Sequence, residues 1–209
     1  LLAMYPGLEI LKGGSQEAEA EFFSEIIALY TIALFVIYAL IAVAFRSYSL
    51  PLLIMTAMPF GFMGAVFGHL IFNLPMALFS YFGIGAAAGV VVNDNLVLID
   101  YVRRLEREGM SPPKALVTSA VSRFRPIFLT TVTTFVGLIP IMAEQSTSAQ
   151  FLKPAVLSLA FGVFFALFVS LLLVPAMYLV GYDWQQMRLA RKRRRTASPG
   201  ADEAASVPV

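Results

Sequence analysis

The sequence contains no cysteine and few charged residues. Of its 209 residues, 13% are Asp, Glu, Lys or Arg, and there is one His and one Trp. Without cysteine there is no disulfide framework or thiolate metal site to identify, and the redox compartment cannot be inferred. Soluble domains carry charge at roughly a quarter of their positions. A chain with so little charge is therefore not an ordinary soluble domain.

Hydrophobic residues dominate instead, at 59% of the sequence with a mean hydropathy of +0.79. They form five runs, each near the roughly 20 residues that cross about 30 Å of hydrocarbon as a helix. The predicted spans are 24–45, 50–72, 77–101, 126–143 and 154–181. The sequence therefore predicts an all-α integral membrane protein with five transmembrane helices.

Lys and Arg are distributed unequally between the two ends of these spans. If the first span runs from outside to inside, thirteen basic residues lie on the inner side and only Lys12 and Lys153 on the outer side. Basic residues near membrane ends stay preferentially in the cytoplasm, so the C-terminus is predicted to be cytoplasmic and the loops near Asn73 and Ser146 external. The net charge of +2 then reflects topology, and no nucleic-acid partner is expected. The basic run at 191–195 could also bind anionic lipid.

Three regions lie outside the spans. Residues 1–14 are expected to form a short strand and turn, within an end of an outward-facing domain at 1–20 that precedes the transmembrane domain at 21–182. Residues 112–124, capped by Ser111 and carrying an apolar stripe, predict an interfacial helix, as a strut on the membrane rather than a mobile regulatory segment. Residues 183–209 are expected to be a disordered cytoplasmic tail.

Small residues recur at a spacing that favours close helix packing. Gly64 and Gly68 stand four apart in GFMGAVFG, as do Gly85 and Gly89 in GIGAAAG. Such pairs let helix backbones approach one another. The second pair leads into a polar step of the third span, which is therefore expected to be buried among neighbouring helices. His69, near the outer end of the second span, is interpreted as an interfacial residue without an assigned role.

The third span contains three consecutive polar residues, Asn93, Asp94 and Asn95, within GVVVNDNLVLID. Asp94 lies nine residues from Arg103, or about 13.5 Å along a helix, which is close to the bilayer centre. An aspartate there costs roughly 2.5–3.5 kcal/mol on insertion scales. Either packing hydrogen bonds hold this carboxylate, or it titrates on an ion path, which is the functional interpretation of an intramembrane acid. Asp100, nearer the inner surface, needs no such explanation.

Four threonines crowd the inner half of the fourth span, in RPIFLTTVTTFVG. Their hydroxyls can bond back to the preceding turn, which accounts for some of them. Depth counted from Arg125 puts Thr134 about 13.5 Å deep, level with Asp94, and Thr130 one turn shallower. Hydroxyls with a carboxylate can carry a proton, but they form no carboxylate cage for a dehydrated Ca²⁺.

Five segments, in this order, resemble the C-terminal transmembrane half of the resistance-nodulation-division (RND) efflux pumps, in the hydrophobe/amphiphile (multidrug) branch. The resemblance covers about residues 5–180. The segments are YPGLEI…GG, FRSYSLPLLIMTAMPFGFMGAVFGH, GVVVNDNLVLIDYVRRLEREGMSPPKAL, RFRPIFLTTVTTFVGLIPI and AQFLKPAVLSLAFGVFFALFVSLLLVPAMYL.

The resemblance implies a proton-driven efflux transporter, not an enzyme, in the bacterial inner membrane. It implies the last five of twelve transmembrane helices, preceded by the end of a periplasmic porter and docking region, and thus the C-terminal piece of a larger pump. No cofactor is expected beyond the proton as coupling ion. The implied partners are the missing N-terminal part of the pump, further copies in a homotrimer, a periplasmic adaptor, an outer-membrane channel, membrane lipid, and hydrophobic or amphiphilic small molecules.

The resemblance also implies roles for single residues. The family's proton relay uses two aspartates on its fourth helix, outside this sequence, and a lysine on its tenth helix, where this chain has Asn93 followed by Asp94. The relay threonine corresponds to Thr130, and an arginine at the inner mouth corresponds to Arg123. Because the lysine is absent, the counter-charge of the relay is unassigned. The candidate relay residues are Asp94, Asn93, Thr130 and Arg123, followed by Thr134 and Asn95.

Three alternatives to a proton-driven multidrug pump remain open. A metal-exporting RND pump would share these helices but show Met, His or Glu clusters in its periplasmic region. A protein-translocation relative of the same superfamily would have half as many helices per chain and a different periplasmic domain. A receptor or scaffold with the same fold would tolerate the loss of Asp94.

Overall fold

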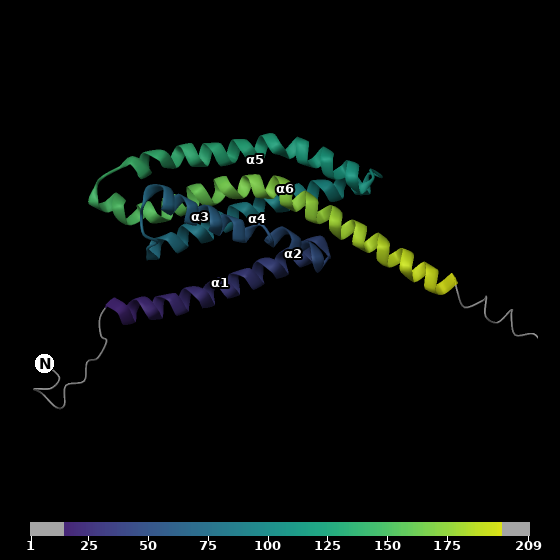
Figure 1. The fold of residues 1–209 in the computed structure, drawn as a ribbon, viewed down its shortest axis with the longest axis horizontal. Coiled ribbons are helices and arrows are strands. Elements are labelled where there is room, and N and C mark those ends of the chain that lie inside the picture. Colours follow the sequence, from purple (N-terminus) through teal and green to yellow (C-terminus); the bar gives the residue numbers. More distant parts are fainter. Residues whose placement is uncertain (1–14, 198–209) are drawn as a thin grey trace, which may run out of the picture. The chain divides into compact units, whose positions relative to one another are not determined.

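The computed structural model describes residues 15–197, and every regular element in that range is an α-helix (Figure 1). Five stretches are long and apolar enough to cross a membrane, so the prediction of an all-α membrane protein with five spans is confirmed. The chain divides into two compact units, residues 1–51 and 52–209. The helices are α1 (Ser15–Phe45), α2 (Ser49–Met55), α3 (Met58–Phe72), α4 (Leu78–Arg107), α5 (Pro112–Ala143) and α6 (Thr147–Ala197).

The first unit is built on α1, which begins well before the predicted start of the first span at residue 24. The helix ends in a turn in which Arg46 has a left-handed backbone, with φ of 49°. The N–H of Ser47 bonds the carbonyl of Ala42 at 3.2 Å, which satisfies one of the carbonyls left free at a helix end. The segment predicted as a strand and turn, residues 1–14, lies outside the described residues, and the rest of the predicted domain end, 15–20, forms the first turns of α1.

The second predicted span, 50–72, is not one helix but two, α2 and α3, separated by a turn at Thr56 and Ala57. Pro59 explains the break, because a proline ring has no N–H to donate and clashes with the carbonyl four residues earlier, here that of Met55. The Thr56 hydroxyl donates to the Leu53 carbonyl at 2.6 Å and helps to close the turn.

The other boundaries also differ from the predicted ones. Residues 112–124 are helical, as predicted, but they continue without interruption into the fourth span, and together the two segments form α5. Pro126 removes one backbone donor without ending the helix, which packed transmembrane helices tolerate. Helix α6 continues to Ala197, so part of the tail expected to be disordered from residue 183 is helical. The rest of that tail, 198–209, lies outside the described residues.

The turn between α5 and α6 is held by Glu144. Its carboxylate accepts the backbone N–H groups of Ser146 and Gln145, each at 3.0 Å. These two hydrogen bonds hold the pKa of Glu144 below its usual value, because they favour the charged form. The turn therefore ends α5 and leads within three residues into α6.

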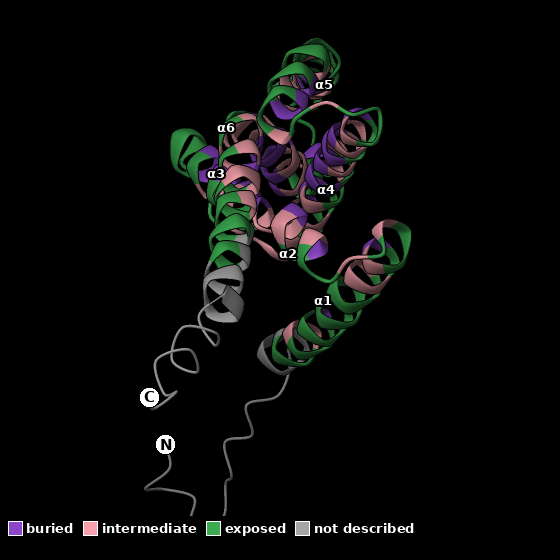
Figure 2. Ribbon diagram, turned by 90° about the vertical axis from the view of Figure 1, so that its right-hand side faces the viewer, coloured by how far each residue is buried: buried purple, intermediate pink, exposed green. Residues whose placement is uncertain are grey.

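Helix α6 is the centre of the second unit and contacts α3, α4 and α5. The buried residues gather where these helices face one another (Figure 2). A Cβ added at Gly162 of α6 would lie 2.9 Å from the Ala87 Cβ and 3.0 Å from the Gly61 carbonyl oxygen. Contacts this short are possible only for glycine, so the backbones of three helices meet closely at this point.

Two predicted packing glycines and one unpredicted glycine also lie against α6. A Cβ at Gly64 would approach the Phe161 carbonyl oxygen to 2.5 Å, and one at Gly68 would meet the Phe161 ring. On α4 the tight contact is at Gly83, where a Cβ would clash with the Ala155 carbonyl. Gly89 instead is exposed and has no neighbour within 4 Å among the described residues, since it lies on the opposite side of α4.

His69 is buried rather than interfacial, and it joins α3 to α4. Its ring Nδ1 lies 2.9 Å from the Ala65 carbonyl oxygen, which can only accept, so Nδ1 carries the proton. In the neutral ring, Nε2 then accepts the Ser80 hydroxyl at 2.9 Å. The Ser80 oxygen in turn accepts the N–H of Ala77 at 3.0 Å. One buried serine therefore satisfies two groups at the outer end of the α3–α4 hairpin.

Replacing Gly83 with alanine should destabilise the chain by about 1–3 kcal/mol, as expected for overpacking against a backbone atom. Gly89→Ala is the matched control, because the new methyl group meets open space, and alanine favours a helix by up to about 1 kcal/mol. The measurement is unfolding of the purified chain in a detergent–SDS titration. Equal stabilities of the two variants would contradict the close contact of α4 with α6.

Replacing Ser80 with alanine should cost about 2–4 kcal/mol, because the buried His69 ring and the half-buried Ala77 N–H each lose a partner. Ser24→Ala is the control: this exposed hydroxyl bonds only back to the Glu21 carbonyl within its own helix. The same titration measures both variants. A Ser80→Ala loss no larger than that of Ser24→Ala would show that the hydrogen-bonded chain does not stabilise the hairpin.

Candidate functional site

The three polar residues at the middle of α4 point in three directions, because successive helix residues are rotated by about 100°. Asn93 is exposed, Asp94 is partly buried, and Asn95 is buried with 1% of its surface accessible. The expectation that this part of the helix is enclosed by neighbours therefore holds for only one side of α4. The other side is open within the unit formed by residues 52–209.

Two buried side chains hold this part of α4 against its neighbours. The Asn95 amide nitrogen donates to the Ile54 carbonyl at 3.4 Å, beside the break between α2 and α3. The Ser119 hydroxyl of α5 donates to the Leu98 carbonyl of α4 at 3.0 Å. The second bond sets the axial register of the antiparallel pair α4 and α5.

This register shows which candidate residues lie at similar depth. Four residues outward from the Ser119–Leu98 bond, the backbones of Arg123 on α5 and Asp94 on α4 lie level with one another. Thr130 lies seven residues farther outward than Arg123, or about 10 Å along the axis. Thr134 lies one turn beyond Thr130. The structure therefore brings Arg123, rather than either threonine, to the depth of Asp94.

The Arg123 side chain turns inward from that level. Its guanidinium lies over the Tyr101 ring, 5.0 Å from the centroid, and its Nε is buried without a hydrogen-bond partner among the described residues. Tyr101 follows Asp94 by two helical turns and so shares its face of α4. Within the described chain, no ion pair joins Arg123 to Asp94. The cation is instead held at the inner end by an aromatic ring.

The threonine hydroxyls bond within α5. Thr130 donates to the Ile127 carbonyl at 2.9 Å, and Thr133 is within reach of the Leu129 carbonyl at 2.8 Å. Back-bonding, which was expected for some of these threonines, thus accounts for at least two of them. Thr131 is the buried member of the group, with 2% exposure. None of the described hydrogen bonds joins a threonine to Asp94.

The open side of α4 has polar groups within the span. Gly89, Asn93 and Asp100 are exposed at spacings of four and seven residues, which place them on one stripe of the helix. On α5, Thr130 and Thr133 are also exposed. Polar groups at membrane depth face other protein segments or a water-filled cavity rather than lipid tails. This surface therefore suits contact with further helices and exchange of protons.

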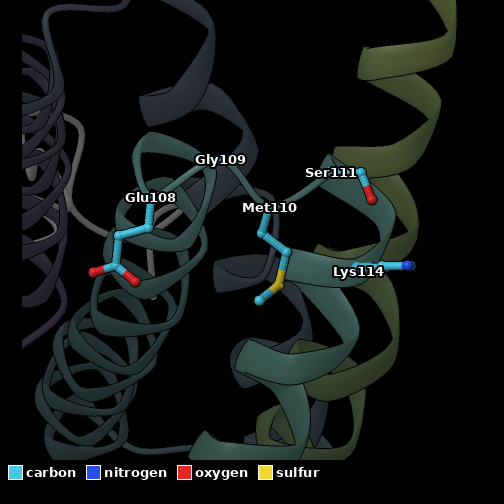
Figure 3. Close-up of a pocket in the computed structure, with 5 residues that line it drawn as sticks. All are labelled: Glu108, Gly109, Met110, Ser111 and Lys114. Carbon is cyan, nitrogen blue, oxygen red and sulfur yellow. The ribbon is translucent and has the colours of Figure 1, made fainter.

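A hollow of about 570 Å³ lies away from these residues, at the turn between α4 and α5 (Figure 3). Gly109, with φ of 93°, ends α4, and the Met110 N–H bonds the Leu105 carbonyl at 3.1 Å. The Glu108 and Lys114 side chains point away from one another there. The hollow is therefore a consequence of the helix end, and its lining offers no convergent set of polar groups.

Several of these residues are not identifiable from the sequence. Ser119 and Tyr101 lie on predicted helices, but only the register of α4 against α5 reveals their partners. Tyr178 of α6 donates to the Glu106 carboxylate at 2.8 Å and ties α6 to the last turn of α4, a contact 72 residues apart in sequence. No group of three His, Cys, Asp or Glu side chains that could hold a metal ion occurs in the described part of the chain.

The chain is similar to curated transport proteins over most of its own length. It is 28% identical over 188 residues to the multidrug resistance protein MdtC of Proteus mirabilis, covering 86% of this chain and 18% of that protein. It is 26% identical over 190 residues to MdtC of Shigella flexneri, covering 88% and 18%. The chain therefore spans less than a fifth of the length of these relatives.

The fold is also found in a solved structure. A crystal structure of a heavy metal efflux pump superposes with a TM-score of 0.73 at 23% identity, covering 80% of this chain and 17% of that one. At this identity the likeness concerns the fold alone. The AcrB/AcrD/AcrF family matches residues 2–181, nearly the whole sequence. The chain thus belongs to the AcrB/AcrD/AcrF family of RND efflux pumps, as the order of its sequence segments predicted.

Proposed function

We propose that this chain is part of a proton-driven efflux transporter that exchanges protons for hydrophobic or amphiphilic small molecules across the bacterial inner membrane. The observation that carries the proposal is Asp94, a carboxyl group in the middle of a transmembrane helix, next to an open polar surface. An acid at such a position is costly unless it is used. Family membership supports export as the overall activity.

In the proposed mechanism, Asp94 takes up and releases the coupling proton. Asn93, on the open side of α4, can donate and accept hydrogen bonds to whatever delivers that proton. Thr130 and Thr134 lie farther outward and serve as hydroxyl steps, reached through water or through groups from other helices. Arg123, level with Asp94 but turned inward onto Tyr101, supplies positive charge near the inner mouth. No cofactor takes part.

The assembly is part of the same proposal. The remaining helices and the periplasmic domains of the pump would cover the open side of α4 and hold the substrate. The further proposed partners are two more copies in a homotrimer, a periplasmic adaptor, an outer-membrane channel and the surrounding lipid. Export of metal ions is the second candidate function, since the heavy metal pump has the same fold in this region.

In the pump that contains this chain, Asp94→Asn should lower drug export by about a hundredfold or more, the size expected when a proton-transfer group is lost. Asp183→Asn is the matched control, because this exposed aspartate lies on α6 and not on the open side of α4. Export of a fluorescent amphiphile by cells with equal membrane levels of each variant is the measurement, repeated from acidic to mildly alkaline pH. Unchanged export by Asp94→Asn cells at every pH would disprove the role.

The same cells separate the two candidate cargoes. A multidrug pump protects cells against amphiphilic drugs, whereas a metal exporter protects them against heavy metal ions. Resistance to metal ions alone, lost in Asp94→Asn, would favour the second candidate and exclude the first.

The orientation is tested separately. The thirteen-to-two distribution of basic residues predicts that a reporter fused after Arg195 is active only in the cytoplasm, and that one inserted at Ser146 is active only in the periplasm. Paired alkaline phosphatase and fluorescent protein fusions measure both sides. The reverse pattern at both positions would invert the topology and with it the direction of proton flow.

A further inference from the structure

The break between α2 and α3 leaves backbone carbonyls without their helical donors inside a membrane span. The helical partner of the Ile54 carbonyl would be the N–H of Met58, but the turn at Thr56 and Ala57 interrupts the ladder between them. The Met55 carbonyl would pair with residue 59, where proline has no N–H. In hydrocarbon each unsatisfied backbone group costs several kcal/mol, so a break at this depth requires donors from elsewhere.

Asn95 supplies one of these donors. Its amide nitrogen reaches the Ile54 carbonyl at 3.4 Å from the other side of the helix contact, 41 residues away in sequence. Ile54 is fully buried and Asn95 is 1% exposed, so water does not provide a substitute. A buried amide in a membrane helix is itself costly unless it is hydrogen-bonded. The hydrogen bond between the Asn95 amide and the Ile54 carbonyl therefore offsets the cost of burying both groups. Loss of either partner would leave the other buried without a hydrogen bond.

The same bond fixes the rotation of α4. Asn95 points toward the break, and Asn93 and Asp94, rotated by about 200° and 100° from it, point elsewhere. Asn93 consequently lies on the open side, and Asp94 lies between the open and the buried sides. Rotating α4 by one residue would bury Asp94 against the break and remove it from the open side.

We propose that Asn95 is a positioning residue, whose amide caps the broken second span at Ile54 and thereby holds α4 in the rotation that presents Asp94 for proton exchange. The capping part concerns the fold alone, and the presenting part rests on the function proposed for Asp94. Asn95 itself does not exchange protons, since an amide carries none that titrates. Its partner is the backbone of the neighbouring span, and the proline at position 59 creates the need for it.

The test is a double-mutant cycle between Asn95 and Pro59. Both residues determine how the backbone carbonyls at the break are hydrogen-bonded, and neither lies on the proposed proton path. Asn95→Leu removes the amide at similar volume and should lower the folding constant of the chain in a detergent–SDS titration about tenfold, the size of one buried hydrogen bond. Pro59→Ala restores a backbone donor and lets the ladder close, so that Met58 returns to Ile54. In that background Asn95→Leu should cost less than about twofold.

Asn93→Leu is the matched control in the same cycle. It removes the same amide from the same helix, two residues away and on the exposed side, and should show no coupling to Pro59→Ala. Additive losses for Asn95→Leu and Pro59→Ala would overturn the capping role. If the Asn95→Leu variant fails to insert into the membrane, Asn95→Ala replaces it. This variant is measured both alone and together with Pro59→Ala, which gives the same comparison.

The positioning role has its own readout in the pump that contains this chain. At equal membrane level, Asn95→Leu should shift the pH dependence of drug export, and the added Pro59→Ala should return it toward that of the parent. Lower stability with an unchanged pH profile would reduce Asn95 to a structural residue and overturn the positioning role. Normal export by Asp94→Asn would instead refute the function proposed for Asp94. The coupling between Asn95 and Pro59 measured in detergent would still show whether Asn95 caps the Ile54 carbonyl.

Discussion

The close backbone contact at Gly162 is the constraint on which the second unit depends. With no Cβ at this position, α6 comes near enough to touch the Gly61 carbonyl of α3 and the Ala87 side chain of α4 at once. Gly64 and Gly83 extend the same contact toward α6. Short side chains can reach between helices held at this separation: Ser80 of α4 bonds His69 of α3, and Asn95 of α4 bonds Ile54 of α2. Hydrophobic association contributes little between helices in lipid, so packing and hydrogen bonds of this kind determine the arrangement.

The sequence was sufficient to locate the spans but not their interruptions. Long apolar runs and the distribution of arginine identify membrane helices, because both reflect transfer from water to lipid, which is a property of each segment alone. Pro59 lies in such a run. From the sequence alone, the helix could have been bent at this proline, broken there or left intact. Its effect depends on whether another side chain can satisfy the freed carbonyls. That side chain is Asn95, which the sequence analysis grouped with its polar neighbours as a candidate relay residue.

The residues of the candidate site could be predicted from the sequence, but their positions relative to one another could not. Asp94 stands out in the sequence because a carboxyl group in a hydrophobic run is costly wherever it points. The level of the threonines relative to Asp94 could not be obtained by counting from Arg125, since Arg125 lies within a continuous helix with no boundary at that position. The Ser119–Leu98 bond fixes the level of α5 against α4, and it places Arg123 rather than Thr134 opposite Asp94. The sequence also did not identify Gly83, which packs against α6, whereas the predicted Gly89 faces open space, because a spacing of four residues does not reveal which side of a helix faces its neighbour.

Gly89 lies on the open side of α4, away from the contact with α6. Glycine in a helix interior costs about 1 kcal/mol relative to alanine, and among the described residues no atom lies within 4 Å of where a Cβ at Gly89 would be. It is one turn from Asn93 on the open side of α4, where the absence of a side chain leaves a shallow notch in the helix surface. A helix crossing at that notch could bring its axis as near to α4 as α6 comes on the opposite side, and its own polar side chains would then meet Asn93 and Asp94 without intervening lipid. The glycine therefore offers a place on the open side of α4 where another helix could pack closely.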